Sequence, residues 1–231
     1  MKTIGIIGGM SWESSLVYYR IINEIVRERL GGLHSAKSLM ISVDFALIEA
    51  MQSMGDWDGA TEVMVNCARQ LESGGADCVI IATNTMHLMY AAVQAAVSLP
   101  VIHIADAAAH RIRAVEINTV GLLGTKFTME MDFYSGRLKE NFGIETIIPE
   151  VADREIVNRV IYQELVLGQI KENSKKDFLR IIHDLRAKGA QGVILGCTEI
   201  PLLVKQEDTD LPLLDTTQLH AQSAVDFALG N

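Results

Sequence analysis

Two short stretches of this sequence match each other, and each ends in a side chain that could transfer a proton. Residues 75–85 read GADCVIIATNT, and residues 189–199 read GAQGVILGCTE. The stretches align without a gap, and the alignment places Thr83 opposite Cys197, 114 residues further along the chain. A thiol ionises with a pKa of about 8.5, which its surroundings easily lower, whereas an aliphatic hydroxyl is a far weaker acid. The pair therefore indicates acid–base chemistry that uses one thiol and one hydroxyl.

Strands and helices are predicted to alternate along the whole chain. Runs rich in Ile, Val and Leu predict strands at residues 3–7, 38–43, 78–82, 101–104, 119–123, 144–148, 193–196 and 213–214. Segments with helical periodicity lie between them, at residues 14–30, 61–71, 85–97, 153–167 and 174–188. This alternation is typical of α/β folds whose parallel sheets are covered by helices on both faces.

The match between the two stretches is part of a longer internal repeat. IGIIG at residues 4–8 matches VGLLG at 120–124, and LPVI at 99–102 matches LPLL at 211–214. We expect two pseudo-symmetric, doubly wound parallel-sheet domains related by internal duplication. Residues 1–118 carry Thr83 and residues 119–231 carry Cys197, and the last helix, about 216–231, is a candidate to pack back on the first domain. Ligands of open parallel sheets bind beyond the carboxyl ends of the strands. We call the strand ends at Thr83 and Cys197 the two tips, and we expect both to approach one ligand.

Composition and charge exclude several classes of function. The 231 residues carry a net charge of −9, which disfavours binding to nucleic acid or to an anionic membrane surface. No apolar run approaches the roughly 20 residues of a membrane span, and the opening MKTIGIIGG predicts a first strand rather than a signal peptide. Three cysteines favour reduced thiols in the cytoplasm over a disulfide framework. The sequence has no CxxC, no HExxH and no Cys/His cluster, so no metal site is expected.

Each tip is expected to join a strand to the start of a helix, where free N–H groups favour an anion. Asn84, Thr85 and Thr198 add side-chain donors, so a carboxylate between the tips is the natural ligand. We also expect the adjacent helix to lower the pKa of Cys197. Removal of a proton from Cα on one face and its return on the other would racemise an amino acid.

These residues resemble the cofactor-independent aspartate/glutamate racemases over essentially the whole chain. The resemblance lies in IGIIGGM at residues 4–10, NTMH at 84–87 and GCTE at 196–199. It implies two opposed catalytic residues, no pyridoxal phosphate, no metal and a homodimer. Cys197 stands at the position of the second catalytic cysteine and Thr83 at that of the first. The remaining positions on or next to the family's ligand-binding residues are Met10, Asn84, Thr85, Thr125, Thr198 and Glu199.

The chain departs from the family pattern at two places. The first departure is that Thr83 replaces a cysteine. The second concerns the segments expected to bind the side chain of an acidic substrate: neither contains Arg or Lys, at residues 44–52 or at 161–168. Gln52 is the best polar candidate in the first segment. Lys126 or Lys171 could supply the basic side chain that the two segments lack. Acidic and neutral polar amino acids therefore both stay open as substrates.

Other functions are compatible with parts of this sequence. A single-cysteine decarboxylase or isomerase of the same superfamily would need only Cys197, and a non-catalytic amino-acid-binding protein would need neither tip to react. A nicotinamide enzyme is disfavoured because the glycines near the start do not fit GxGxxG. Cys67 and Cys78 are expected to be core thiols, and His87 is expected to satisfy a backbone group.

Overall fold

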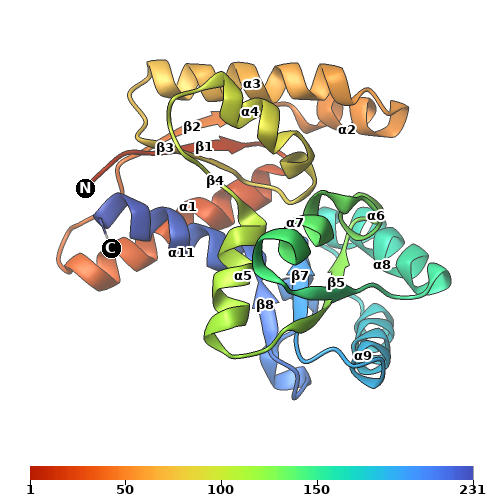
Figure 1. Cartoon of the computed structure of the whole chain (residues 1–231). Helices are drawn as coiled ribbons and strands as arrows, with labels where there is room; N and C mark the ends of the chain where they lie inside the picture. Colours follow the sequence, from red (N-terminus) through yellow and green to blue (C-terminus); the bar gives the residue numbers. More distant parts are fainter. Residues whose placement is uncertain (231) are drawn as a thin grey trace. The chain divides into compact units, whose positions relative to one another are not determined.

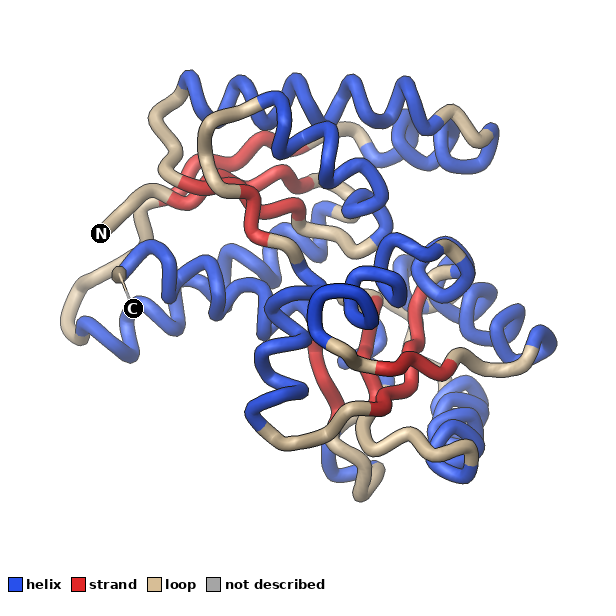
Figure 2. The backbone as a smooth tube through the Cα atoms, in the orientation of Figure 1, coloured by secondary structure: helices blue, strands red, loops and turns tan. Residues whose placement is uncertain are grey.

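The computed structural model describes residues 1–230, which form two compact units. Unit 1 combines Met1–Ile104 with the chain from Thr217 onward, and unit 2 is Ala105–Thr216. Each unit contains one four-stranded parallel sheet covered by helices (Figures 1 and 2). Within residues 1–230, no helix is both long and apolar enough to cross a membrane.

Unit 1 is built on a sheet with the strand order β2-β1-β3-β4. Its strands are β1 (Ile4–Gly8), β2 (Ser38–Ser42), β3 (Cys78–Ile81) and β4 (Val101–Ile102). Its helices are α1 (Trp12–Leu30), α2 (Phe45–Met54), α3 (Trp57–Ser73), the 3-10 helix η1 (Thr85–Met89), α4 (Tyr90–Ala96) and α11 (Thr216–Leu229).

Both faces of this sheet are buried, which explains its almost continuously apolar strands. Ile4 and Ile6 of β1 pack with α1 and α11 on one face. Ile7 points to the opposite face and packs with residues of α2, α3 and α4. Helices α2, α3 and α4 lie on one side of this sheet, and α1 and α11 lie on the other (Figure 1). Each apolar side chain in β1 is fully buried, as expected for a parallel sheet between two layers of helices.

Unit 2 repeats this architecture with the strand order β6-β5-β7-β8. Its strands are β5 (Thr119–Gly124), β6 (Glu145–Ile147), β7 (Val193–Gly196) and β8 (Leu213–Asp215). Its helices are α5 (Ile104–Ala114), α6 (Lys126–Glu130), α7 (Asp132–Phe142), α8 (Val151–Gln163), η2 (Leu165–Leu167), α9 (Glu172–Ala187), α10 (Ile200–Leu203) and η3 (Gln206–Asp208). Leu123 and Leu195 pack with α8, α9 and α10 in one continuous core.

The register of the two sheets reproduces the internal repeat seen in the sequence. Gly5 of β1 pairs with Val79 of β3, and their sequence counterparts Gly121 and Val193 pair in the same way. The β3–β4 and β7–β8 pairs also correspond, since Val79 pairs with Val101 and Val193 pairs with Leu213. The two stretches that end in Thr83 and Cys197 therefore occupy equivalent places in equivalent sheets.

All eight predicted strands are present in parallel sheets, so the expected α/β fold with two duplicated sheets is confirmed. Helices α2, α5, α6 and α7 lie in segments for which the sequence analysis predicted no helix. The second copy of the sequence repeat begins near Asn118, whereas unit 2 begins at Ala105. Helix α5 belongs to unit 2, where Asp106 accepts two hydrogen bonds from Arg137 of α7 at 2.5 and 2.7 Å.

Cys78 makes the stability of unit 1 sensitive to alkaline pH. Burial in β3 raises the pKa of its thiol from 9.0 to about 12. The folded chain therefore keeps this proton above pH 9 while the unfolded chain releases it, so the free energy of unfolding falls as the pH rises from about 9 towards 12. We expect wild type to lose about 2 kcal/mol more than Cys78→Ala between pH 8 and pH 10.5, at about 1.4 kcal/mol per pH unit. Urea unfolding at both pH values measures this difference, and parallel pH profiles would contradict it.

Candidate active site

The Cys197 tip in unit 2 contains a thiol that is hydrogen-bonded to a buried carboxylate. Cys197 follows β7 directly and is half-buried. Its Sγ donates to Oε2 of Glu199 at 2.9 Å, and Oγ1 of Thr198 donates to the same oxygen at 2.7 Å. Glu199 is 8% exposed, so this carboxylate is held among protein groups. One oxygen thus accepts a hydrogen bond from both preceding side chains.

The pKa of Cys197 lies well above its usual value, so the expectation of a lowered pKa is wrong for this structure. Burial is the largest cause, and the charge and hydrogen bond of Glu199 raise the pKa further against smaller contributions from backbone N–H groups. Helix α10 has only four residues and supplies few aligned peptide dipoles. The resting thiol is therefore protonated. It can act as a base only after it gives up its proton, and Glu199 lies within hydrogen-bonding distance to accept it.

Glu199→Gln is expected to change thiol reactivity and turnover in opposite directions. Removing the negative charge lowers the pKa of Cys197, so more of the thiol is ionised and carbamidomethylation by iodoacetamide at pH 7.5 should become roughly tenfold faster. Turnover should fall, because the amide cannot take the thiol proton. Mass spectrometry of labelled Cys197 across pH 6–10 gives the first result, and chiral chromatography gives the second.

The matched control is Glu207→Gln, which removes one exposed negative charge in the nearby η3. It should leave both the labelling profile and the turnover unchanged. Faster turnover in Glu199→Gln would show that Glu199 only restrains the thiol, and an unshifted labelling profile would contradict the electrostatic account.

The Thr83 tip in unit 1 is held by two side chains that bind consecutive backbone carbonyls. The half-buried Thr83 follows β3 and donates its N–H to the carbonyl of Ile81 at 2.8 Å. Oγ of Ser14 donates to the carbonyl of Ala82 at 3.1 Å, and Nδ1 of His87 lies 2.8 Å from the carbonyl oxygen of Thr83. The expectation that His87 satisfies a backbone group is confirmed.

Ser14 is a site residue that the sequence analysis missed. The available signal was the Ser14-Ser15 pair in the first turn of α1, because two adjacent small hydroxyl residues next to a glycine turn are suited to hydrogen-bonding backbone groups. Asn84 and Thr85 are both buried at the start of η1, directly beyond Thr83.

The turn after β1 and the turn after β5 carry the next two predicted site residues. Gly9 has a φ of +93°, and a Cβ there would lie 2.2 Å from the carbonyl oxygen of Val43, so only glycine fits. Met10 follows it and is 6% exposed. Thr125 follows β5, and its side chain accepts the N–H of Thr128 at 3.3 Å as the N-cap of α6.

The residues considered for a substrate side chain are placed as follows. Gln52 is buried in α2, and its Nε2 donates to Sδ of Met86 at 3.2 Å, although a thioether is a weak acceptor. Lys171 forms an ion pair with Glu164 at 3.5 Å. Lys126 is exposed, and Val166, which lies in the segment 161–168 that contains no Arg or Lys, packs against the core of unit 2.

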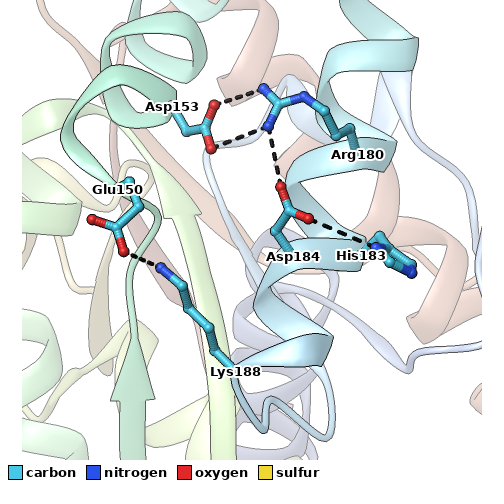
Figure 3. Close-up of polar contacts among 6 residues, drawn as sticks. All are labelled: Glu150, Asp153, Arg180, His183, Asp184 and Lys188. Atoms are coloured by element: carbon cyan, nitrogen blue, oxygen red, sulfur yellow. Dashed lines mark hydrogen bonds and ion pairs between the residues drawn. The ribbon is translucent and has the colours of Figure 1, made fainter.

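A cavity of about 280 Å³ in unit 2 lies away from the Cys197 tip. Lining residues such as Lys188 precede β7, whereas Cys197 follows it. The charged side chains of its lining are all paired: Lys188 pairs with Glu150, and Arg180, which is outside the lining, bridges Asp153 and Asp184 at 2.6 and 3.1 Å (Figure 3). These contacts join α8 to α9. Among the described residues, no three His, Cys, Asp or Glu side chains gather closely enough to hold a metal ion.

Comparison with known proteins shows the family of this chain. The model of the Asp/Glu/hydantoin racemase family matches residues 7–224, so the chain belongs to this family. It is similar to the broad-specificity amino-acid racemase RacX of Bacillus subtilis, with 23% identity over 74% of this chain and 73% of the relative.

Two solved structures share the whole fold. A candidate Asp/Glu racemase from Yersinia pestis is 52% identical, with a TM-score of 0.94 over 99% of this chain and 100% of that one. An aspartate racemase homologue from Pyrococcus horikoshii is 38% identical, with a TM-score of 0.87 over the same shares of the two chains. The expected two-domain α/β architecture is therefore that of the family.

Proposed function

We propose that this chain is a cofactor-independent amino-acid racemase that uses Cys197 and Thr83 on opposite faces of Cα. The observation that carries the proposal is the equivalence of the two tips in a duplicated fold that belongs to a racemase family. A thiol and a hydroxyl at equivalent positions provide one proton-transfer group for each face. Neither group needs a metal or a prosthetic group to move a proton.

The proposed reaction begins when Glu199 takes the proton of the Cys197 thiol. The resulting thiolate removes the α-proton of the L-amino acid and becomes a thiol again. The hydroxyl of Thr83 donates its proton to the opposite face of the carbanion and gives the D-amino acid. Water then returns a proton to Thr83, and the proton held by Glu199 leaves to solvent, so the proton count of the enzyme is restored.

We further propose that the remaining polar groups hold the amino acid. Asn84, Thr85 and Thr198 supply donors for the α-carboxylate, and Thr125 and the backbone at Met10 complete that set. Gln52 is the candidate for a polar atom of the substrate side chain, because the hydrogen bond that its Nε2 makes within residues 1–230 goes to a thioether, which is a weak acceptor. Acidic and neutral polar amino acids are both compatible with an amide at this place.

A substrate panel tests this function. The protein is dialysed against a chelator and incubated in deuterated water with each of the common L-amino acids and with 5-substituted hydantoins. Chiral chromatography measures the other enantiomer, and mass spectrometry measures deuterium at Cα. The proposal expects exchange and D-product from at least one polar amino acid, with less than about a thousandfold preference for aspartate and glutamate, or about 4 kcal/mol.

Three outcomes would replace the proposal. Loss of CO₂ with an achiral or single-enantiomer product would indicate a decarboxylase. Saturable binding with neither exchange nor racemisation would indicate an amino-acid-binding protein. Turnover of hydantoins alone would indicate that this member of the family acts on hydantoins and not on amino acids. The homodimer that the resemblance implies stays a prediction, and light scattering at micromolar concentration tests it.

A further inference from the structure

Three buried histidines gather next to the Thr83 tip in unit 1. His87, His103 and His220 are each at most 3% exposed. The ring centroid of His87 lies 4.7 Å from that of His103 and 5.5 Å from that of His220. Buried polar side chains are almost always hydrogen-bonded, so the partners of these rings indicate which nitrogen carries hydrogen.

The two ring nitrogens of His87 have different roles. Nδ1 lies 2.8 Å from the carbonyl oxygen of Thr83, which can only accept, so Nδ1 carries the hydrogen. Nε2 accepts the backbone N–H of Ile104 at 3.2 Å, so it carries none. His87 is therefore a neutral imidazole in the Nδ1–H tautomer.

The Ile104 contact links His87 to the place where the chain leaves unit 1. Ile104 is the first residue of α5, and the N–H groups of a first helical turn have no acceptor within the helix. His220 holds the same segment, because its Nε2 donates to the carbonyl of Ile102 at 2.8 Å and its Nδ1 accepts the hydroxyl of Tyr18 at 3.0 Å. The segment from Ile102 to Ile104 is thus tied to two of the three imidazoles.

Side chains also hold the tip itself at two successive carbonyls. Ser14 binds the carbonyl of Ala82, and His87 binds the carbonyl of Thr83. The direction of the Thr83 side chain depends on its backbone, so loss of either contact would let the hydroxyl move. A shift of about 1 Å in a reacting group is enough to cost roughly a hundredfold in rate.

We propose that His87 is a positioning residue for proton transfer at Thr83: its Nδ1–H fixes the Thr83 carbonyl, while its Nε2 anchors the ring to the start of α5. This inference rests on the proposed role of Thr83 in racemisation. His87 touches neither the substrate nor the reacting atoms in this account. It acts only through the backbone of the tip.

Three substitutions of His87 separate its two contacts. His87→Asn keeps an N–H donor two bonds from Cβ, as Nδ1 is, and loses the acceptor for Ile104. His87→Gln places its amide three bonds from Cβ, as Nε2 is, and loses the donor for Thr83. His87→Phe keeps the ring and loses both contacts. His220→Asn is the matched control, because His220 is equally buried and its hydrogen bonds given above go to Ile102 and Tyr18.

The kinetic readout compares the two faces of Cα in deuterated water. The ratio of α-hydrogen exchange to racemisation, starting from the L-enantiomer, should stay within about threefold of wild type in His87→Asn and His220→Asn. It should rise about tenfold in His87→Gln and His87→Phe, because only crossing to the D-enantiomer uses Thr83. KM should change little. Urea midpoints of all variants report any general loss of stability.

A second readout does not depend on activity. Long-range ¹H–¹⁵N spectra of ¹⁵N-histidine-labelled protein, assigned with His87→Phe, should show His87 with Nδ1 protonated and Nε2 bare at pH 7. An Nε2–H tautomer or an imidazolium would overturn the proposal. So would an equal rise of the exchange-to-racemisation ratio in His87→Asn and His87→Gln. An equal loss of α-hydrogen exchange and racemisation in the His87 variants would also overturn it. A wild type that exchanges neither enantiomer would refute the proposed function and the catalytic part of this inference, while the spectrum would still decide how His87 is bound.

Discussion

Cys197→Ser is expected to lower both α-hydrogen exchange and racemisation of the L-enantiomer by about a thousandfold or more. The pKa of an aliphatic hydroxyl lies far above the value of about 8.5 for a thiol, so serine forms far less of the base at neutral pH. The hydrogen bond to Glu199 does not compensate, because a carboxylate cannot hold the proton of so weak an acid. Deuterium incorporation by mass spectrometry and product by chiral chromatography give the two rates.

The matched control for this substitution is Cys67→Ala. Cys67 is 5% exposed in α3 and packs within the core of unit 1, so its loss should change stability and leave the exchange rate near that of wild type. Calorimetric binding of the L-substrate should survive in Cys197→Ser, which separates lost chemistry from lost folding. Exchange at the wild-type rate in Cys197→Ser would assign the base to another residue.

Thr83→Val is expected to separate the two faces of the reaction. Valine keeps the size and branching of threonine and removes only the hydroxyl. Racemisation of the L-enantiomer should fall about a hundredfold or more, which is the usual contribution of a general acid, while α-hydrogen exchange should stay within about threefold. Exchange at the L face needs only Cys197 in this account, so the carbanion still forms and returns to the L-enantiomer.

The wild type should already show part of this asymmetry. The enantiomers of an amino acid have equal free energy in water, so no enzyme can favour one at equilibrium. A hydroxyl is nevertheless a slow partner beside a thiol, so the L-substrate should exchange its α-hydrogen faster than it racemises. Thr83→Cys should raise turnover from the D-enantiomer at least about tenfold, because a thiol ionises near pH 8.5. Equal exchange and racemisation rates in wild type, with no gain in Thr83→Cys, would remove Thr83 from the mechanism.

Sequence was most informative where one physical cause governs every residue of an element. The strands of both sheets are buried on two faces, so they read as short apolar runs, and all eight were predicted. The internal match was equally informative, because a parallel register repeats whenever the same spacing repeats. Two of the helices that were missed are unlike the others: α6 has only five residues, and the buried face of α5 is largely alanine rather than Ile, Val or Leu.

The properties of the candidate site depended on contacts that no pattern of residue types contains. Glu199 was predicted as a ligand-binding residue, but the structure shows its carboxylate accepting hydrogen bonds from Cys197 and Thr198. Ser14 and His87 lie on different helices, and only the fold brings them to consecutive carbonyls of one tip.

The sequence by itself therefore determined the α/β class, the duplication and the equivalence of Thr83 with Cys197. All three follow from the order and spacing of residue types along the chain. Only the tertiary structure decided the direction of the Cys197 pKa, because burial and the Glu199 carboxylate act on the thiol through space. The same reason applies to α11: the sequence made its packing on the first domain only a candidate, and its contacts with the sheet of unit 1 are made through space, far along the chain.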